Sequence, residues 1–234
     1  EVPAKLYAKG VRAGDVKYFD YNEDGDISDA DRMNVGKAIP DFYGGITSNF
    51  SYKGFDLSLF GQFSVGGKVM SAWRGVNGSE GTDHLGLALS NVKVNDRGES
   101  VEQYFNVSKE VANGYWRGEG TSNTIPRPVR IGVHTGYDYD YNVQTSTRYL
   151  EDASYFKLKT VTLGYTLPES VVKKLRVNSL RVYVSADNLL TLTKYSGYDP
   201  ETSFSGSPGD SNYGVDFGLQ PVLRTFIFGL NLSF

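Results

Sequence analysis

The sequence predicts an all-β fold that comprises about five strands of a large antiparallel transmembrane β-barrel with long extracellular loops. Three observations lead to this prediction. Apolar residues recur with a period of two along runs of about ten residues. Aromatic residues make up 14% of the 234 residues and gather at the ends of these runs, as in an interfacial girdle. Short connections also alternate with very long ones, which is the usual asymmetry of a barrel.

The first two strands are expected as a hairpin over residues 41–67. Large apolar residues alternate with small or polar residues in the runs DFYGGITSNFSYK and FDLSLFGQFSVGG. The connection between the two strands is only Lys53 and Gly54, which predicts a tight two-residue turn.

A second hairpin is expected over 148–195, and a last strand over 222–234. The runs DASYFKLKTVTLGYTLP and LRVYVSADNLLTLTKY supply the hairpin, and VLRTFIFGLNLSF supplies the last strand. In the first of these runs Val161 and Leu163 share one phase, whereas Phe156 and Leu158 belong to the other. This change of phase predicts a β-bulge between them.

The remaining segments, 1–40, 68–147 and 196–221, are predicted to be extracellular loops. The last strand ends on Phe234, which resembles the C-terminal signature of outer-membrane barrels and would place the C-terminus in the periplasm. Counting the strands back from that end places all three long segments outside the cell.

The first loop contains an acidic stretch, DYNEDGDISDAD, with the spacing of an EF-hand calcium loop. Oxygen-bearing residues stand at its ligand positions: Asp20, Asn22, Asp24, Asp26 and Asp31. Asp26 would offer its backbone carbonyl, and Asp31 replaces the usual glutamate. We expect a structural Ca²⁺ or Mg²⁺ here; the alternative is a solvated Asx-rich turn that binds nothing. No helix pair is predicted around the loop, which excludes a calcium sensor.

Composition excludes several classes of function. The net charge of −3 gives no reason to expect nucleic-acid binding, and the absence of cysteine excludes a thiol nucleophile. The two histidines, His84 and His134, are far apart in predicted loops, with no serine and carboxylate placed beside them. We therefore expect no enzyme and no catalytic residues.

Three blocks of the chain are similar to SusC/RagA-type TonB-dependent outer-membrane transporters, in the C-terminal portion of their barrel. The first runs from GDVKYFDYNEDGDISDADR to IPDFYGG, the second is RYLEDASYFKLKTVTLGYTLP, and the third is RVYVSADNLLTLTKYSGYDPE. With the terminal strand, the resemblance covers nearly the whole chain.

The resemblance implies a barrel of roughly 22 strands in the outer membrane of a Gram-negative bacterium, surrounded by lipid and lipopolysaccharide. It also implies an N-terminal plug, contact with TonB, and a SusD-like surface lipoprotein that acts as a lid. The imported nutrient would be an oligosaccharide or a peptide. Because about five strands leave edges that cannot stand unpaired in lipid, this chain must pair with the remainder of its barrel.

Aromatic and arginine residues in the long loop are candidates for contact with substrate or with the lid: Trp73, Arg74, Tyr115, Trp116 and Arg117. Aromatic faces stack on sugar rings, and arginine donates planar hydrogen bonds. The alternative is that these side chains only pack the loop. Two other functions also remain open at this point, a passive porin and a secreted, calcium-stabilised β-sandwich for binding or adhesion.

Overall fold

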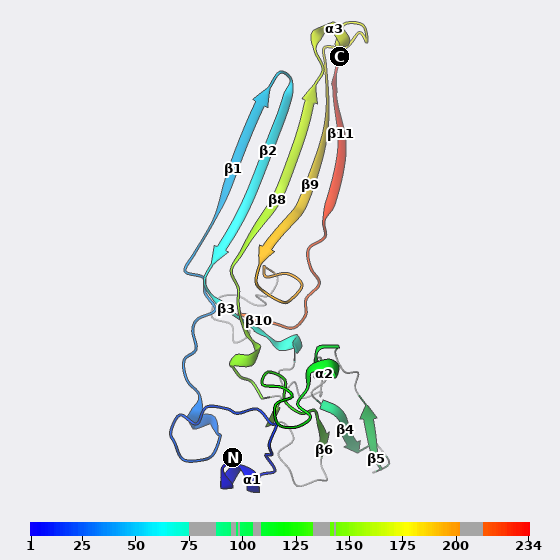
Figure 1. The fold of residues 1–234 in the computed structure, drawn as a ribbon. Helices are drawn as coiled ribbons and strands as arrows, with labels where there is room; N and C mark the ends of the chain where they lie inside the picture. The colour runs from blue at the N-terminus through cyan, green and yellow to red at the C-terminus, as the bar shows by residue number, and fades with distance from the viewer. Residues whose placement is uncertain are drawn as a thin grey trace. The chain divides into compact units, whose positions relative to one another are not determined.

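Five long strands form one antiparallel sheet in the order β1-β2-β8-β9-β11 (Figure 1). Their bounds are β1 (Phe42–Tyr52), β2 (Phe55–Val65), β8 (Tyr155–Thr166), β9 (Ser179–Thr193) and β11 (Thr225–Ser233). They are 9 to 15 residues long, which exceeds the 5–6 residues typical of soluble sheets and suffices to cross a bilayer. The prediction of an all-β, barrel-type antiparallel sheet is confirmed.

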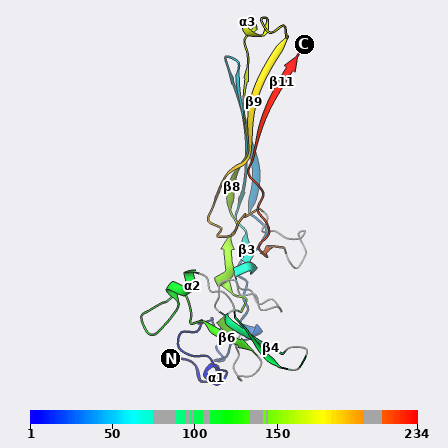
Figure 2. The same ribbon diagram turned by 90° about the vertical axis from the view of Figure 1, so that its right-hand side faces the viewer.

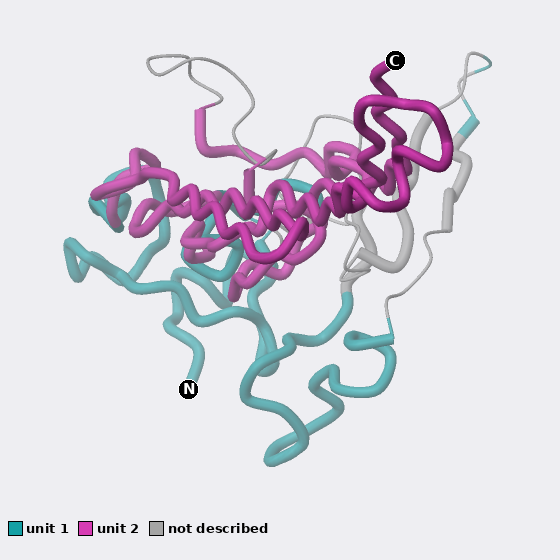
Figure 3. The backbone as a smooth tube through the Cα atoms, turned by 90° about the horizontal axis from the view of Figure 1, so that it is seen from above, with its two compact units in different colours: residues 1–35, 70–150 teal, residues 36–69, 151–234 magenta. Residues whose placement is uncertain are grey.

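The computed structural model describes residues 1–74, 88–94, 97, 99–104, 109–132, 141–142, 144–201 and 213–234. Residues 75–87, 133–140 and 202–212 of the two later predicted loops, with His84 and His134 among them, lie outside the described residues. The chain divides into unit 1, residues 1–35 and 70–150, and unit 2, residues 36–69 and 151–234 (Figure 3).

The β1–β2 hairpin turns on two residues with left-handed backbone. Lys53 has φ 47° and Gly54 has φ 87°, and the strands pair up to Tyr52 opposite Phe55. Two consecutive positive φ angles define the turn whose twist matches that of the strands. The Lys-Gly pair therefore sets the register of the hairpin.

The sheet has one apolar face and one polar face, in a single layer when seen edge-on (Figure 2). One cross-strand row of the apolar face contains Phe50, Leu57, Leu163, Val184 and Phe228. The adjacent row of the polar face contains Asn49, Ser58, Thr162, Ser185 and Ile227. Phe228 is 82% exposed, so among the described residues no core of side chains covers it, as one would in a sandwich.

Polar side chains bond to one another across the polar face. The hydroxyls of Thr162 and Ser185 are 2.8 Å apart. The Arg181 guanidinium donates two hydrogen bonds to the carboxylate of Asp56, one of them from Nε at 2.9 Å. These bonds link β2, β8 and β9 on the side of the sheet opposite the apolar row.

The predicted bulge is confirmed at Lys159. Against β2, the consecutive residues Phe60 and Gly61 pair with Thr160 and Leu158, so β8 has one extra residue there. On the other side of β8, two residues of β9, 188 and 189, lie opposite Lys159. The extra residue in β8 changes the phase of the strand. Lys159 and Thr160 consequently both belong to the polar face.

The short connections of the sheet share one end. The β1–β2 turn, the β8–β9 connection with helix α3 (Glu169–Val172), and the end of β11 lie together, because Phe55 pairs with Tyr165, and Ser233 with Ser179. The long segments leave the sheet from its opposite end, which we call the loop end.

The loop segments contain short elements that the sequence did not predict. Unit 1 holds α1 (Ala4–Ala8), η1 (Asp29–Asp31), η2 (Ala72–Arg74), α2 (Lys109–Gly114), η4 (Thr147–Tyr149) and a sheet of order β5-β4-β6, formed by β4 (Ala88–Val94), β5 (Ser100–Tyr104) and β6 (Val129–Gly132). A further small sheet has the order β10-β3-β7, formed by β3 (Lys68–Ser71), β7 (Leu150–Asp152) and β10 (Val215–Asp216). Within the described residues, no helix is long and apolar enough to cross a membrane.

Candidate functional site

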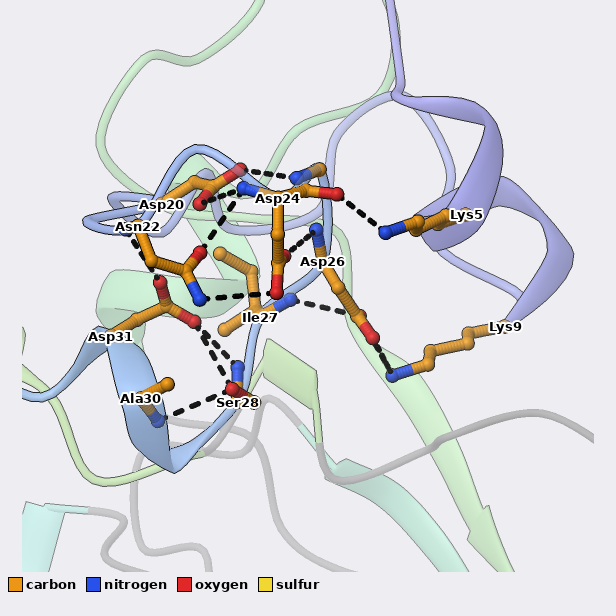
Figure 4. A network of polar contacts seen from close by, with 11 residues as sticks. Lys5, Lys9, Asp20, Asn22, Asp24, Asp26, Ile27, Ser28, Ala30 and Asp31 are labelled. Atoms are coloured by element: carbon orange, nitrogen blue, oxygen red, sulfur yellow. Dashed lines mark hydrogen bonds and ion pairs between the residues drawn. The ribbon is translucent and has the colours of Figure 1, made fainter.

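The acidic loop is held by its own carboxylates, which cap backbone N–H groups (Figure 4). The Asp20 carboxylate accepts from the N–H of Asp24 at 3.2 Å and of Gly25 at 2.8 Å. The Asp31 carboxylate accepts from the N–H of Tyr21 at 2.9 Å and of Ser28 at 2.7 Å. The Ser28 N–H is the leading cause that lowers the pKa of Asp31.

Two lysines of the preceding segment bond to the same loop. The Lys9 Nζ lies 2.7 Å from the Asp26 carboxylate, and the Lys5 Nζ donates to the backbone carbonyl of Asp24 at 2.5 Å. The hydrogen bond from Lys9 is the main cause that lowers the pKa of Asp26. The Asp26 side chain is thus engaged with Lys9, and the use of its backbone carbonyl as an ion ligand stays a prediction.

Three of the five proposed ligand residues, Asp20, Asn22 and Asp24, contact one another within the loop. The Asn22 Nδ2 donates to the Asp24 Oδ2 at 3.1 Å, and the Asn22 Oδ1 accepts from the Asp24 N–H at 3.1 Å. Asn22 and Asp24 therefore lie beside Asp20, as alternate positions of a calcium loop do. No group of three acidic or histidine side chains in the described part of the chain is assembled as a metal site. The ion stays a prediction.

A polar network in unit 1, missed in the sequence, connects the segment before the acidic loop to two distant segments. The Asp15 carboxylate accepts four hydrogen bonds: from the Arg12 N–H at 2.8 Å, the Arg127 Nε at 2.6 Å and Nη2 at 2.9 Å, and the Asn142 Nδ2 at 2.9 Å. Asn142 also accepts from the Val16 N–H at 2.8 Å. The Asp15 side chain is only 4% exposed, so these bonds satisfy a buried charge.

The acidic loop is also held by apolar contacts. Ile27, two residues after Gly25, packs against a buried cluster of Leu6, Val11 and Tyr141. The ring of Tyr141 meets Tyr18 edge-on at 5.0 Å between centroids. The branched side chain of Ile27 thus attaches the loop to unit 1.

Three of the predicted contact residues, Tyr115, Trp116 and Arg117, follow helix α2. Tyr115 packs against the buried cluster of Val111, Ile125 and Tyr149. The Arg117 guanidinium lies over the Tyr115 ring, 4.6 Å from its centroid. Stacking of this kind orients an exposed arginine.

The indole ring of Trp116 packs directly on Gly14. Gly14 has φ +90°, and an added Cβ would lie 2.2 Å from the Trp116 Cε3. Trp73 and Arg74 belong to a different element, the 3-10 helix η2. The structure thus explains how Tyr115 and Trp116 are positioned, and substrate or lid contact by the five residues stays a prediction.

A second network missed in the sequence lies in unit 2, at the loop end of β8. The Lys157 Nζ lies 2.5 Å from the Asp199 Oδ1 and 2.8 Å from the Glu201 Oε2, and the Lys159 Nζ lies 2.5 Å from the same oxygen of Glu201. Burial opposes ionisation of Glu201, but the hydrogen bonds from the two lysines lower its pKa on balance. The sequence shows only a lysine pair and an acidic pair more than forty residues apart.

The chain is similar to TonB-dependent receptors over nearly its whole length. It is 34% identical to TonB-dependent receptor P3 of Formosa agariphila over 93% of the chain, and 26% identical to TonB-dependent receptor SusC of Bacteroides thetaiotaomicron over 98%. It covers 19% of each of these relatives, so it spans about a fifth of their length. No family model matches the chain.

Solved structures share the fold. The RagAB peptide importer in the closed-closed state matches with a TM-score of 0.59 and 25% identity, over 90% of this chain and 19% of that one. The RagAB peptide transporter matches with a TM-score of 0.58 and 24% identity, over 85% and 18%. With the two-faced sheet and its long strands, these likenesses lead to one conclusion. The chain belongs to the SusC/RagA family of TonB-dependent outer-membrane receptors and forms part of the β-barrel of such a protein.

Proposed function

We propose that this chain forms one sector of the wall of a transporter that imports a nutrient across the outer membrane with energy delivered by TonB. The observation that carries the proposal is the two-faced sheet. One face has a continuous apolar row in which Phe50, Leu163 and Phe228 are exposed, and the other face is polar and hydrogen-bonded. Contact with lipid requires an apolar face, and contact with a water-filled lumen is compatible with a polar face. The similarity to TonB-dependent receptors supports energy coupling over passive diffusion.

The proposed orientation has the loop end outside the cell and the short connections, with the end of β11, in the periplasm. Outer-membrane barrels have short periplasmic turns and longer extracellular loops. The two-residue turn at Lys53 and Gly54 shares its end of the sheet with the β8–β9 connection, and both fit the periplasmic side. Units 1 and 2 would then both carry extracellular segments.

The proposed cargo is an oligosaccharide or a peptide, captured beneath a SusD-like lipoprotein lid. The similarity to a RagAB peptide importer favours a peptide, and the similarity to SusC keeps a glycan in consideration. Arg117, exposed and stacked on Tyr115, is proposed to contact the lid or the cargo. The plug and the segment that contacts TonB would come from the rest of the protein.

Uptake by cells that express the full-length transporter tests this function. Fluorescent peptides and oligosaccharides are supplied to cells with and without TonB. We expect accumulation of one of the two classes that stops when TonB is deleted or the proton gradient is collapsed. Uptake that continues without TonB would indicate a passive pore, and a protein that is soluble without detergent would contradict a place in the membrane.

We also propose that the acidic loop binds one Ca²⁺ or Mg²⁺ as a structural ion. Calorimetric titration of the full-length protein is expected to give a dissociation constant of about 0.1–1 mM for Ca²⁺, as in extracellular modules. Asp24→Ala removes a proposed ligand and is expected to abolish binding. Asp29→Ala is the matched control, because Asp29 pairs with Arg32 in solvent and is 88% exposed. Equal titration curves for the two variants would contradict the site.

A further inference from the structure

Residues 195–201, which follow β9, lie against the loop end of the sheet; we call them the inner strap. Pro200 is fully buried, and Tyr195 and Asp199 are each 6% exposed. The Ser196 N–H and hydroxyl bond to the two carboxylate oxygens of Glu151, at 2.8 and 2.7 Å. Although the strap contains no helix or strand, its conformation is held by specific contacts.

The strap is fixed to the polar face of β8 by two lysines. Lys157 pairs in register with Gln62, and the Gln62 amide donates to the Tyr155 hydroxyl at 3.2 Å. The Lys157 side chain is 2% exposed and contacts the carboxylates of Asp199, which is buried, and of Glu201, whose side chain is 27% exposed. A buried ammonium group is stable only beside groups of opposite charge, which the two carboxylates supply. Removal of the lysine would in turn leave buried carboxylate charge without a partner.

The bulge in β8 adds the second lysine to this contact. Without the extra residue, the apolar phase of Val161 and Leu163 would continue through residue 159. The bulge places Lys159 on the same face as Lys157, where its Nζ lies 2.5 Å from Glu201. Re-aiming one side chain is a recognised use of a bulge. The Glu201 N–H also donates to the Asp199 Oδ1 at 2.9 Å, which joins the two carboxylates into one acceptor group.

We propose that Lys157 and Lys159 are positioning residues that hold the inner strap, through Asp199 and Glu201, against the lumen side of the barrel wall and so shape the entrance for the imported molecule. This proposal rests on the proposed function, because that function assigns the polar face to the lumen. It concerns a part of the wall for which the sequence predicted only a loop.

Hydrogen exchange of the full-length protein in detergent tests the anchor without any need for transport. Lys159→Met keeps the aliphatic stem and removes the charge. A hydrogen bond between charged groups contributes more than about 1.4 kcal/mol, which is a factor of about ten in an equilibrium constant. The backbone N–H groups of Asp199 and Glu201 should therefore exchange about tenfold faster in this variant. Lys159→Arg, which keeps the charge, should restore slow exchange.

Lys173→Met is the matched control, because Lys173 pairs with Glu169 in solvent and both side chains are more than 70% exposed. This variant should exchange like the wild type at 199–201. If Lys159→Met also exchanges like the wild type, the anchor is contradicted. A second check is Glu201→Gln: combined with Lys159→Met it should add little to the single change, and a fully additive effect would also contradict the shared contact.

Uptake by the same variants tests the role of the strap at the entrance. Lys159→Met is expected to raise the half-saturating substrate concentration while the maximal, TonB-dependent rate is unchanged, because the strap acts before the energised step. Faster exchange with unchanged uptake would contradict a role at the entrance. A wild-type protein without energised uptake would contradict the proposed function, while the exchange rates would still decide the anchor.

Discussion

Asp15→Ala is expected to lower the free energy of opening of unit 1 by about 3 kcal/mol, because removing one partner of a buried ion pair leaves the others uncompensated. The Asn142 amide, 1% exposed, would lose its acceptor on Asp15. Arg127, which is 34% exposed, would recover part of the loss by contact with water. The expected loss of free energy of opening therefore lies at the lower end of the range for buried ion pairs.

Hydrogen exchange of peptides that cover 12–18 and 125–132 measures this effect in the full-length protein. Both peptides should lose protection together, because the Arg127 N–H also donates to the Gly14 carbonyl at 2.8 Å and ties the two segments. The control is Asp29→Ala, which removes an exposed ion pair. Loss of protection confined to one of the two peptides would mean that the network does not join them.

Leu230→Arg is expected to destabilise the barrel by about 2–4 kcal/mol, and Asn231→Arg by much less. Leu230 lies on the apolar face of β11 and pairs with Val182, whereas Asn231 lies on the polar face and pairs with Arg181. The two positions are adjacent, so they share nearly the same depth in the membrane. The difference between the variants therefore reports which face meets lipid.

Resistance to unfolding by urea in lipid vesicles measures the Leu230 and Asn231 variants side by side. A lower urea midpoint is expected for Leu230→Arg than for Asn231→Arg. Equal midpoints, or a lower midpoint for Asn231→Arg, would show that the apolar face of β11 is not in contact with hydrocarbon.

The strands could be predicted because their signal is local and long. An alternation sustained over about ten residues is hard to produce by chance, and the Lys53-Gly54 turn and the bulge near Lys159 both showed as breaks or shifts in that alternation. The short strands β5 and β6, at five and four residues, lack the length for such a signal. They fell within a predicted loop for this reason.

The side-chain networks could not be predicted, because their partners are far apart in the sequence. Asp15 and Arg127 are separated by 112 residues, and Lys157 and Asp199 by 42. A lone acidic residue carries no pattern that identifies its partner. Similarly, the packing of Trp116 on Gly14 depends on a left-handed glycine whose neighbour only the folded chain brings close.

The five-stranded sheet is proposed to form part of the barrel wall in the membrane, with its apolar face toward lipid. This chain has no cysteine. Spin labels are attached to single cysteines placed along β11 of the full-length protein in lipid vesicles, after any cysteine in the rest of that protein has been replaced by serine. Labels at 226, 228, 230 and 232 should collide with dissolved oxygen, and labels at 225, 227, 231 and 233 with a water-soluble nickel complex. The reverse pattern, or exposure of all eight positions to the nickel complex, would contradict a membrane-spanning β11.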